Sequence, residues 1–125
     1  MLKHGGLLAL LIVMTATASI AHAQQKKGAN GGMVAISQGH PIEFMVKGQD
    51  LVFYINDDDG SPLSTKEMRG RATVQDGGKP ATVQLEPAAP NMMVGKLQVP
   101  LGSKARVVFS ASLHGHSLTA RYVTE

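Results

Sequence analysis

The chain has 125 residues, with 12 basic and nine acidic side chains, for a formal net charge of +3. It has no cysteine, which excludes disulfides, a lipoprotein anchor and a cysteine nucleophile. The positive excess is small and forms no continuous block along the sequence, so we expect no nucleic-acid partner.

The first predicted element is a targeting signal. Lys3 precedes an apolar run over residues 7–14, and small residues then end in Ala21-His22-Ala23. This order is typical of a Sec-type signal peptide over residues 1–23, cleaved between Ala23 and Gln24. A retained membrane anchor is disfavoured because the apolar run is much shorter than the roughly 20 residues that a spanning helix needs. We therefore expect a periplasmic or secreted protein, with no stable membrane anchor after cleavage.

The mature chain is predicted to be one β domain. Residues 24–31 are polar and are expected to form a flexible leader, and residues 32–125 form the domain. Apolar and polar residues alternate there over short runs that end at glycine, proline, asparagine or aspartate, which predicts strands and no long helix. The expected strands are 33–37, 41–47, 50–56, 70–75, 81–86, 92–99, 104–113 and 116–123. On the second of these, Ile42 and Phe44 are expected to face the core and Glu43 to face solvent.

The clearest of these strands begins at Asp50. Leu51, Phe53 and Ile55 alternate with other apolar residues, and the run stops at the turn-forming residues 56–62. Short strands at this spacing favour a sandwich over a barrel or a βαβ fold. About 100 residues is also typical of an immunoglobulin-like domain. We therefore predict an all-β, antiparallel immunoglobulin-like β-sandwich of seven to eight strands.

The register of the last hairpin can be predicted as well. If His114 and Gly115 form a two-residue loop, Leu113 lies opposite His116. Each residue expected to face the core then meets another such residue, because directly opposed residues share a face. The remaining pairs are Ala111 with Leu118, Phe109 with Ala120, and Val107 with Tyr122.

The strand order also suggests a metal site. In an antiparallel fold, alternate loops lie at the same end of the domain. The loops after the first, fifth and seventh strands contain His40, Met92, and His114 with His116, and the loop after the third contains the Asp57–Asp59 cluster. Imidazole and thioether groups suit copper, and thioethers suit Cu(I) in particular. We hypothesise that the three histidines and Met92 bind copper or another transition metal. The alternative is that His40 and His114 are ordinary loop residues exposed to solvent.

Other chemistry has little support. Asp57-Asp58-Asp59-Gly60 is interpreted as a solvated turn, because a calcium loop of the EF-hand type needs alternating ligands, a later glutamate and flanking helices. The chain has no G-x-S-x-G, H-E-x-x-H or phosphate-loop motif, so we expect no enzyme activity. With three phenylalanines, two tyrosines and no tryptophan, a stacking platform for bases or sugars is poorly supplied.

Several short motifs follow one another along the mature chain: Gly31-Gly32-Met33-Val34, Pro41-Ile42-Glu43-Phe44, Asp59-Gly60-Ser61-Pro62-Leu63, Leu85-Glu86-Pro87 and His114-Gly115-His116. Their order resembles that of the small exported β-sandwich module at the periplasmic start of heavy-metal efflux adaptor (membrane-fusion) proteins. The family often has a histidine before the Gly-Gly pair, where this chain has Asn30. The resemblance implies an accessory of metal efflux, with a periplasmic efflux or metal-handling protein as its partner.

Two functions are therefore expected from the sequence. The first is a non-enzymatic periplasmic protein that captures a transition metal and passes it to a partner. The alternative is an adhesion or assembly module that pairs through an exposed strand edge, with incidental histidines and no metal site.

Overall fold

The computed structural model describes residues 25–125, so the predicted signal peptide lies outside the described residues. The described chain is all-β, as the sequence predicts, and contains no helix that could span a membrane. The eight expected strands are present, and a short ninth strand precedes them. The strands are β1 (Lys26–Lys27), β2 (Met33–Ser37), β3 (His40–Lys47), β4 (Asp50–Ile55), β5 (Arg69–Gln75), β6 (Ala81–Ala88), β7 (Met92–Lys96), β8 (Arg106–Leu113) and β9 (His116–Val123).

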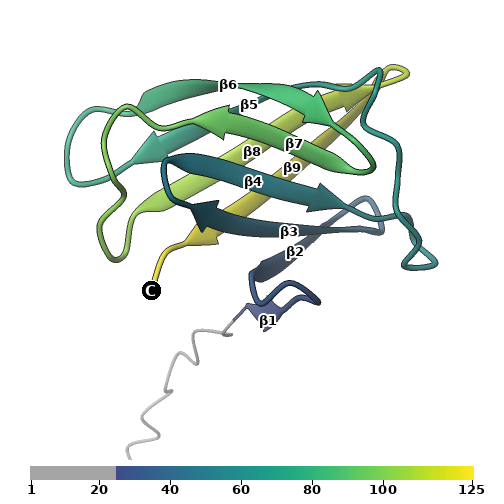
Figure 1. The fold of residues 1–125 in the computed structure, drawn as a ribbon, viewed down its shortest axis with the longest axis horizontal. Coiled ribbons are helices and arrows are strands. Elements are labelled where there is room, and N and C mark those ends of the chain that lie inside the picture. The colour runs from purple at the N-terminus through teal and green to yellow at the C-terminus, as the bar shows by residue number, and fades with distance from the viewer. Residues whose placement is uncertain (1–24) are drawn as a thin grey trace, which may run out of the picture.

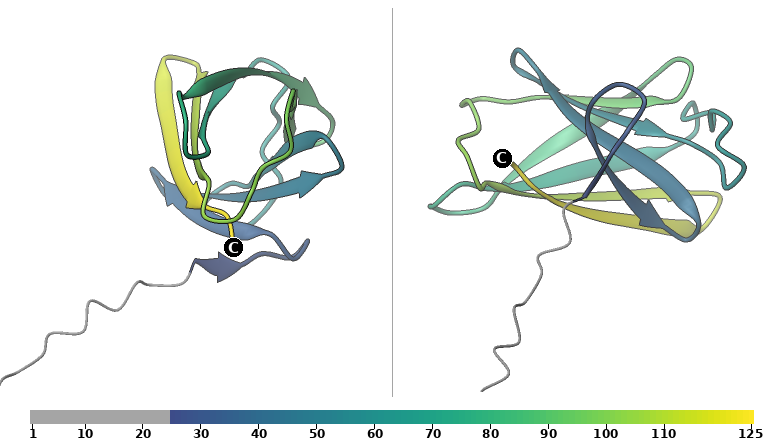
Figure 2. Two further views of the ribbon diagram at one scale, coloured as in Figure 1. Left: turned by 90° about the vertical axis from the view of Figure 1, so that its left-hand side faces the viewer. Right: turned by 90° about the horizontal axis from the view of Figure 1, so that it is seen from below.

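The predicted two-sheet, immunoglobulin-like β-sandwich is wrong. All nine strands form one antiparallel sheet in the order β1-β2-β3-β4-β7-β6-β5-β8-β9, which curls into a half-barrel (Figures 1 and 2). The sheet is continuous because the first part of β6 pairs with β5 and residues Glu86 to Ala88 pair with β7. Alternation along a strand shows that one face is buried, but it does not show whether a second sheet or the same curled sheet buries it.

The predicted register of the last hairpin is confirmed in all four pairs. Its turn residues, His114 and Gly115, have φ angles of 49° and 79°. The β2–β3 hairpin turns in the same way, with φ angles of 51° at Gln38 and 80° at Gly39. Positive φ at both central residues is the geometry of the two-residue turn that matches the twist of the flanking strands.

An aromatic cluster explains why the sheet curls. Phe53 lies 5.1 Å from Phe44 and 4.7 Å from Phe109, measured between ring centroids, and Phe44 lies 5.1 Å from Tyr122. These side chains come from β3, β4, β8 and β9, so the cluster joins strands from the two halves of the sheet. The Tyr122 hydroxyl donates a buried hydrogen bond of 2.6 Å to the carbonyl of Ile42. Burial raises the pKa of the Tyr122 phenol, and the negative charge of Glu43 raises it further.

Glu43 is the main exception to the predicted alternation, because it was expected to face solvent and is 6% exposed. Its carboxylate accepts hydrogen bonds from the backbone N–H of Asn30 at 3.0 Å and of Gly32 at 2.7 Å. A Cβ at Gly28 would lie 2.3 Å from the Glu43 carboxyl carbon, so any larger residue at position 28 would push the Glu43 side chain out of place. Part of the expected flexible leader therefore packs over Glu43, and the buried carboxylate of Glu43 holds it there through these hydrogen bonds.

The two ends of the sheet meet through side chains. The Gln25 side chain donates to the Arg121 carbonyl at 2.8 Å, and the Gln38 side chain donates to the Ser117 carbonyl at 3.2 Å. Between them, the Thr119 N–H donates to the Ser37 hydroxyl at 2.9 Å. We call this line of three contacts the β9 seam. The seam uses backbone N–H and C=O groups on the open edge of β9, where no neighbouring strand provides hydrogen-bond partners.

Candidate functional site

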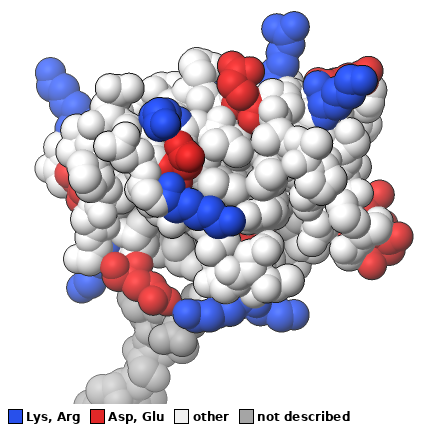
Figure 3. Space-filling view, in the orientation of Figure 1, with Lys and Arg blue, Asp and Glu red and all other residues white. Residues whose placement is uncertain are grey.

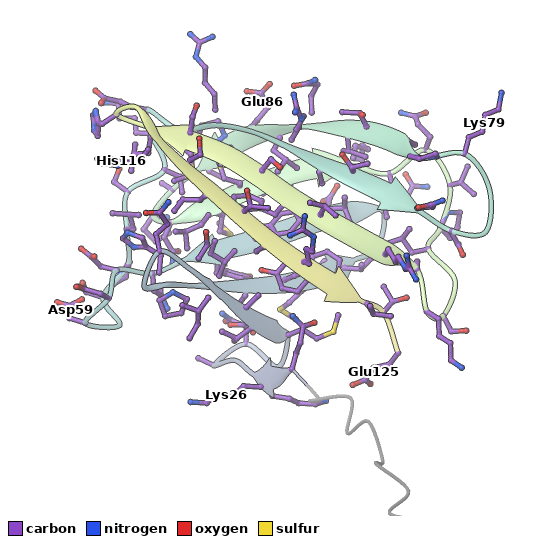
Figure 4. All side chains as sticks on the ribbon, turned by 180° about the vertical axis from the view of Figure 1, so that it is seen from behind. Lys26, Asp59, Lys79, Glu86, His116 and Glu125 are labelled. Carbon is purple, nitrogen blue, oxygen red and sulfur yellow. The ribbon has the colours of Figure 1, made fainter. Side chains whose placement is uncertain are left out.

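The loops that carry the predicted metal ligands lie at one end of the half-barrel. Every strand pair is antiparallel, so the β2–β3, β4–β5, β6–β7 and β8–β9 connections share this end (Figure 1). Figure 4 shows His116 and Asp59 here, with Lys79 at the opposite end. Proximity along the barrel axis is necessary for a shared site, but the side chains must also point the same way.

His40 and His116 occupy core-side positions at the rim of the half-barrel, where His40 is partly buried and His116 is exposed. His40 alternates in phase with the buried Ile42, and His116 alternates in phase with the buried Leu118. The Nδ1 atom of His40 lies 3.1 Å from the carbonyl oxygen of Asn56 and 3.7 Å from a carboxylate oxygen of Asp57. The hydrogen bond between the Gln38 side chain and the Ser117 carbonyl brings their two hairpins together.

Met92 and His114 are placed differently. Met93 takes the buried position on β7, so the register turns its neighbour Met92 to the outer face. His114 is exposed in its turn, with Nε2 3.5 Å from a carboxylate oxygen of Glu67. Among residues 25–125, no group of three close histidine, aspartate or glutamate side chains includes a histidine. The four-residue metal site stays a prediction, and Met92 faces away from the two core-side histidines.

The acidic loop behaves as a turn. The side chains of Asp57, Asp58 and Asp59 each offer an oxygen within 4.8 Å of the others. However, the Asp57 carboxylate accepts the N–H of Asp58 at 2.9 Å, and the Asp59 carboxylate accepts the N–H of Ser61 at 2.9 Å. Hydrogen bonds from Ser61 lower the pKa of Asp59, since they stabilise its charged form. These contacts cap the loop internally and fit the expected solvated turn.

A different set of side chains gathers on the outside of β5, β8 and β9. All four arginines of the chain lie on these strands, namely Arg69, Arg71, Arg106 and Arg121. Each is exposed and alternates with buried core residues, so all four lie on the outer face. The three strands contain no aspartate or glutamate. We call the outward-facing residues of β5, β8 and β9 the arginine face.

Strand pairing orders the arginine face into four rows, each of which contains one arginine. Between the arginines the rows present mainly hydroxyl groups, which can both donate and accept hydrogen bonds. The rows are Arg69–Ser112–Ser117, Arg71–Ser110–Thr119, Thr73–Val108–Arg121 and Gln75–Arg106–Val123.

A groove of about 460 Å³ follows the first two rows. Its polar lining includes Arg69, Arg71, Gln84, Ser110 and Thr119. Guanidinium groups bind carboxylate, sulfate or phosphate through paired N–H donors, and neighbouring hydroxyls can complete such a site. Within residues 25–125, the ion pairs involve His40, Lys96 and His114, so none of the four arginines is neutralised by an acidic partner.

The opposite side of the half-barrel has a different charge pattern. The face seen in Figure 3 carries basic and acidic side chains close together over β3, β4 and β7. One such pair is Lys96 with Asp50, whose charged atoms lie 3.7 Å apart. Interspersed charges of both signs cancel at a distance, whereas charges of one sign add. The arginine face is therefore the more strongly anion-attracting side.

The arginine face is not visible as a run of basic residues along the chain, because its four arginines lie on three strands. The arginine face forms only when β5 pairs with β8, and these two strands are separated along the chain by β6 and β7. The predicted β8–β9 register does place Arg106 and Arg121 on one face. A usable signal is that every arginine falls on a polar position of an alternating run.

Comparison with known proteins does not assign the chain to a family. No family model matches the chain, and no curated protein or solved structure matches it with statistical significance. The resemblance to the β module of efflux adaptors remains a hypothesis that rests on its short motifs.

Proposed function

We propose that the protein is a non-enzymatic binding module whose arginine face holds an anionic ligand. The observation that carries this proposal is the collection of all four arginines on one face of three strands without an acidic residue. The predicted signal peptide supports action in the periplasm or outside the cell.

The energetics favour a ligand at this position. Arg69 and Arg71 are two residues apart on β5, which separates their backbone positions by about 7 Å. Two like charges at that distance in water repel each other by about 0.6 kcal/mol. A bound anion reverses this repulsion, and each hydrogen-bonded charged contact contributes about 1.5–3 kcal/mol. Among residues 25–125, the arginines have no acidic partner, so a bound anion would supply most of their favourable charge interactions.

The groove lining supports binding without catalysis. It includes arginine, glutamine, serine and threonine, together with Gly70, Ala111 and Leu118, and no histidine, carboxylate or lysine. General acid–base chemistry needs a group that exchanges a proton near the working pH, and arginine keeps its proton throughout that range. The groove is equipped to hold an anion and not to transform it.

The proposal is tested by fluorescence anisotropy with labelled polygalacturonate. We expect binding that weakens as salt is added, because salt screens exposed charges. The double variant Arg69→Gln/Arg71→Gln should bind about 100-fold more weakly, since it loses two charged contacts. The control Lys47→Gln/Lys96→Gln removes the same charge from the opposite face and should stay within about twofold. Equal losses in both variants would contradict the proposal. So would the absence of binding both to polygalacturonate and to a single-stranded oligonucleotide of equal charge.

A second candidate function is capture of a transition metal at the loop end, for transfer to a periplasmic efflux protein. The core-side positions of His40 and His116 at the same end favour it. Titration with Cu(I), Cu(II) and Zn(II) should then raise the thermal stability, by about 2.7 kcal/mol at 100 times the dissociation constant. The His40→Gln/His116→Gln variant should lose this increase. If no metal raises the stability of the unaltered protein, this candidate is excluded.

A further inference from the structure

Resting on the proposed anion-binding function, we infer that the ligand is a linear acidic polysaccharide, held along the four rows of the arginine face. We call the four guanidinium groups the arginine ladder. From one end to the other, they belong to Arg69, Arg71, Arg121 and Arg106.

The spacing of the ladder calls for an elongated ligand. Neighbouring rows are two residues apart along the strands, or about 6.7 Å, so the four rows extend over about 20 Å. The arginines lie on β5, β8 and β9, and adjacent strands are about 4.8 Å apart, so the ladder is about 10 Å wide. A small anion can contact one or two arginines at this spacing. Only an extended polyanion can contact all four.

The side chains around the ladder favour a sugar polymer over a nucleic acid. Proteins that bind single-stranded nucleic acids stack the bases on exposed aromatic rings. Phe44, Phe53, Phe109 and Tyr122 are buried in the core, and Tyr54 lies on β4, outside the arginine face. The rows instead offer hydroxyls from Ser110, Ser112, Ser117 and Thr119, which can exchange hydrogen bonds with the hydroxyls of sugar rings.

The surroundings of the ladder are compatible with a ligand that runs along the strands. The adjoining strand β6 has a single acidic residue, Glu86, which follows the Leu85–Gly70 pair near the Arg69 end. Beyond that end, the exposed Glu67 is within 3.5 Å of His114. No acidic residue interrupts β5, β8 or β9 between the first and the fourth row. Beyond the other end, the exposed Asp76 follows Gln75, with its carboxylate accepting the N–H of Gly102 at 2.8 Å, and Glu125 follows the end of β9. A negatively charged chain therefore meets acidic residues beyond both ends of the ladder and none along its length.

The experiment is isothermal titration of the protein with oligogalacturonates of increasing length at low salt. Affinity should rise with length until the oligomer reaches all four arginines, and should then level off. Arg106→Gln should weaken binding of the longest oligomer about tenfold, the loss expected for one charged contact, and leave digalacturonate within about twofold. Lys96→Gln on β7 is the matched single-charge control. Methyl-esterified oligomers, which keep the sugar and lose the charge, should not bind.

The outcomes separate the ligand class from the underlying function. If affinity does not depend on length and Arg106→Gln has no effect, while Arg69→Gln/Arg71→Gln still abolishes binding, the ladder is overturned and the proposed function stands. If a single-stranded oligonucleotide of equal charge binds as tightly as the longest oligomer, the polysaccharide assignment is overturned. If no anion of any length binds, the ladder and the proposed function are both overturned.

Discussion

At the scale of single residues, the buried hydroxyl of Tyr122 gives a sharp test of the core. Tyr122→Phe leaves the Ile42 carbonyl without its 2.6 Å hydrogen bond, and an unsatisfied buried acceptor costs about 1–3 kcal/mol. Urea denaturation should show a loss of that size. Tyr54→Phe is the matched control, because Tyr54 bonds an exposed lysine, and its loss should be under about 0.5 kcal/mol. Equal effects in the two variants would contradict the assignment.

The same tyrosine predicts how stability depends on alkaline pH. The folded protein holds the pKa of Tyr122 above its ordinary value, chiefly because of burial. Between pH 10 and the higher folded-state pKa, the unfolded chain loses the phenolic proton and the folded chain keeps it. Stability from this group is therefore complete below about pH 10 and falls by about 1.4 kcal/mol per pH unit above it. Tyr122→Phe should show a shallower decline over the same range in urea denaturation, and an unchanged decline would contradict the prediction.

The turn residue His114 predicts a stabilising substitution. Its φ of 49° lies in the left-handed region, which asparagine tolerates better than histidine. The contact with Glu67 offsets little, since both side chains are about 70% exposed. We expect His114→Asn to raise the free energy of unfolding by about 0.5–1 kcal/mol. His116→Asn, on an ordinary strand position, is the control and should give no increase. A loss of stability in His114→Asn would instead indicate a structural role for the imidazole.

At this scale, the sequence predicts correctly which side chains are buried where apolar and polar residues alternate along a strand. Ile42, Phe44, Phe53 and Phe109 are buried as expected. The prediction failed at Glu43, whose burial depends on the segment 28–32 folding back over β3. A charged residue in an alternating run looks solvent-exposed unless a distant segment supplies its hydrogen bonds, and no local pattern reports that.

At the scale of elements, strands and hairpins were predictable and closure of the sheet was not. Turn residues mark the strand ends, and the two-residue loop fixes the β8–β9 register. The pairing of β5 with β8 and of β4 with β7 joins strands that are not consecutive. Such contacts depend on the whole fold, which is why the sandwich prediction failed while the all-β class is confirmed.

The β9 seam makes a prediction about local opening. Ser37→Ala removes the acceptor of the Thr119 N–H, so the amide hydrogen of Thr119 should exchange faster with solvent. We expect a loss of about 1 kcal/mol in global stability, the usual contribution of one hydrogen bond. Ser112→Ala on the outer face of β8 is the control and should leave the exchange of Thr119 unchanged. Unchanged exchange in Ser37→Ala would mean that the seam does not protect this edge.

The seam also bears on the alternative of strand-edge assembly. A partner strand added to β9 would have to displace the contacts made by Gln25, Ser37 and Gln38. At the other end of the sheet, the edge strand β1 has two residues, which offers few hydrogen bonds to a partner. Both edges of the sheet therefore offer few free backbone groups to a partner strand, which disfavours strand-edge assembly.

At the scale of the whole molecule, the net charge conceals the feature that matters. A formal charge of +3 in 125 residues is modest, yet all the arginines project from one side of the half-barrel. The sequence excludes a continuous basic block but cannot exclude a stripe assembled from three strands. The histidine end was predictable from the order of the strands, whereas the face on which each side chain lies required the observed register.

The most direct measurement is an NMR titration of the protein with an oligogalacturonate long enough to span the four rows. Signals of the arginine side-chain N–H groups, and of backbone amides in β5, β8 and β9, should shift and saturate together. Signals from β3, β4 and β7, including Lys47 and Lys96, should stay in place. Shifts that scatter over the lysines of both faces, or arginine signals that do not move at saturating ligand, would contradict a binding function for the arginine face.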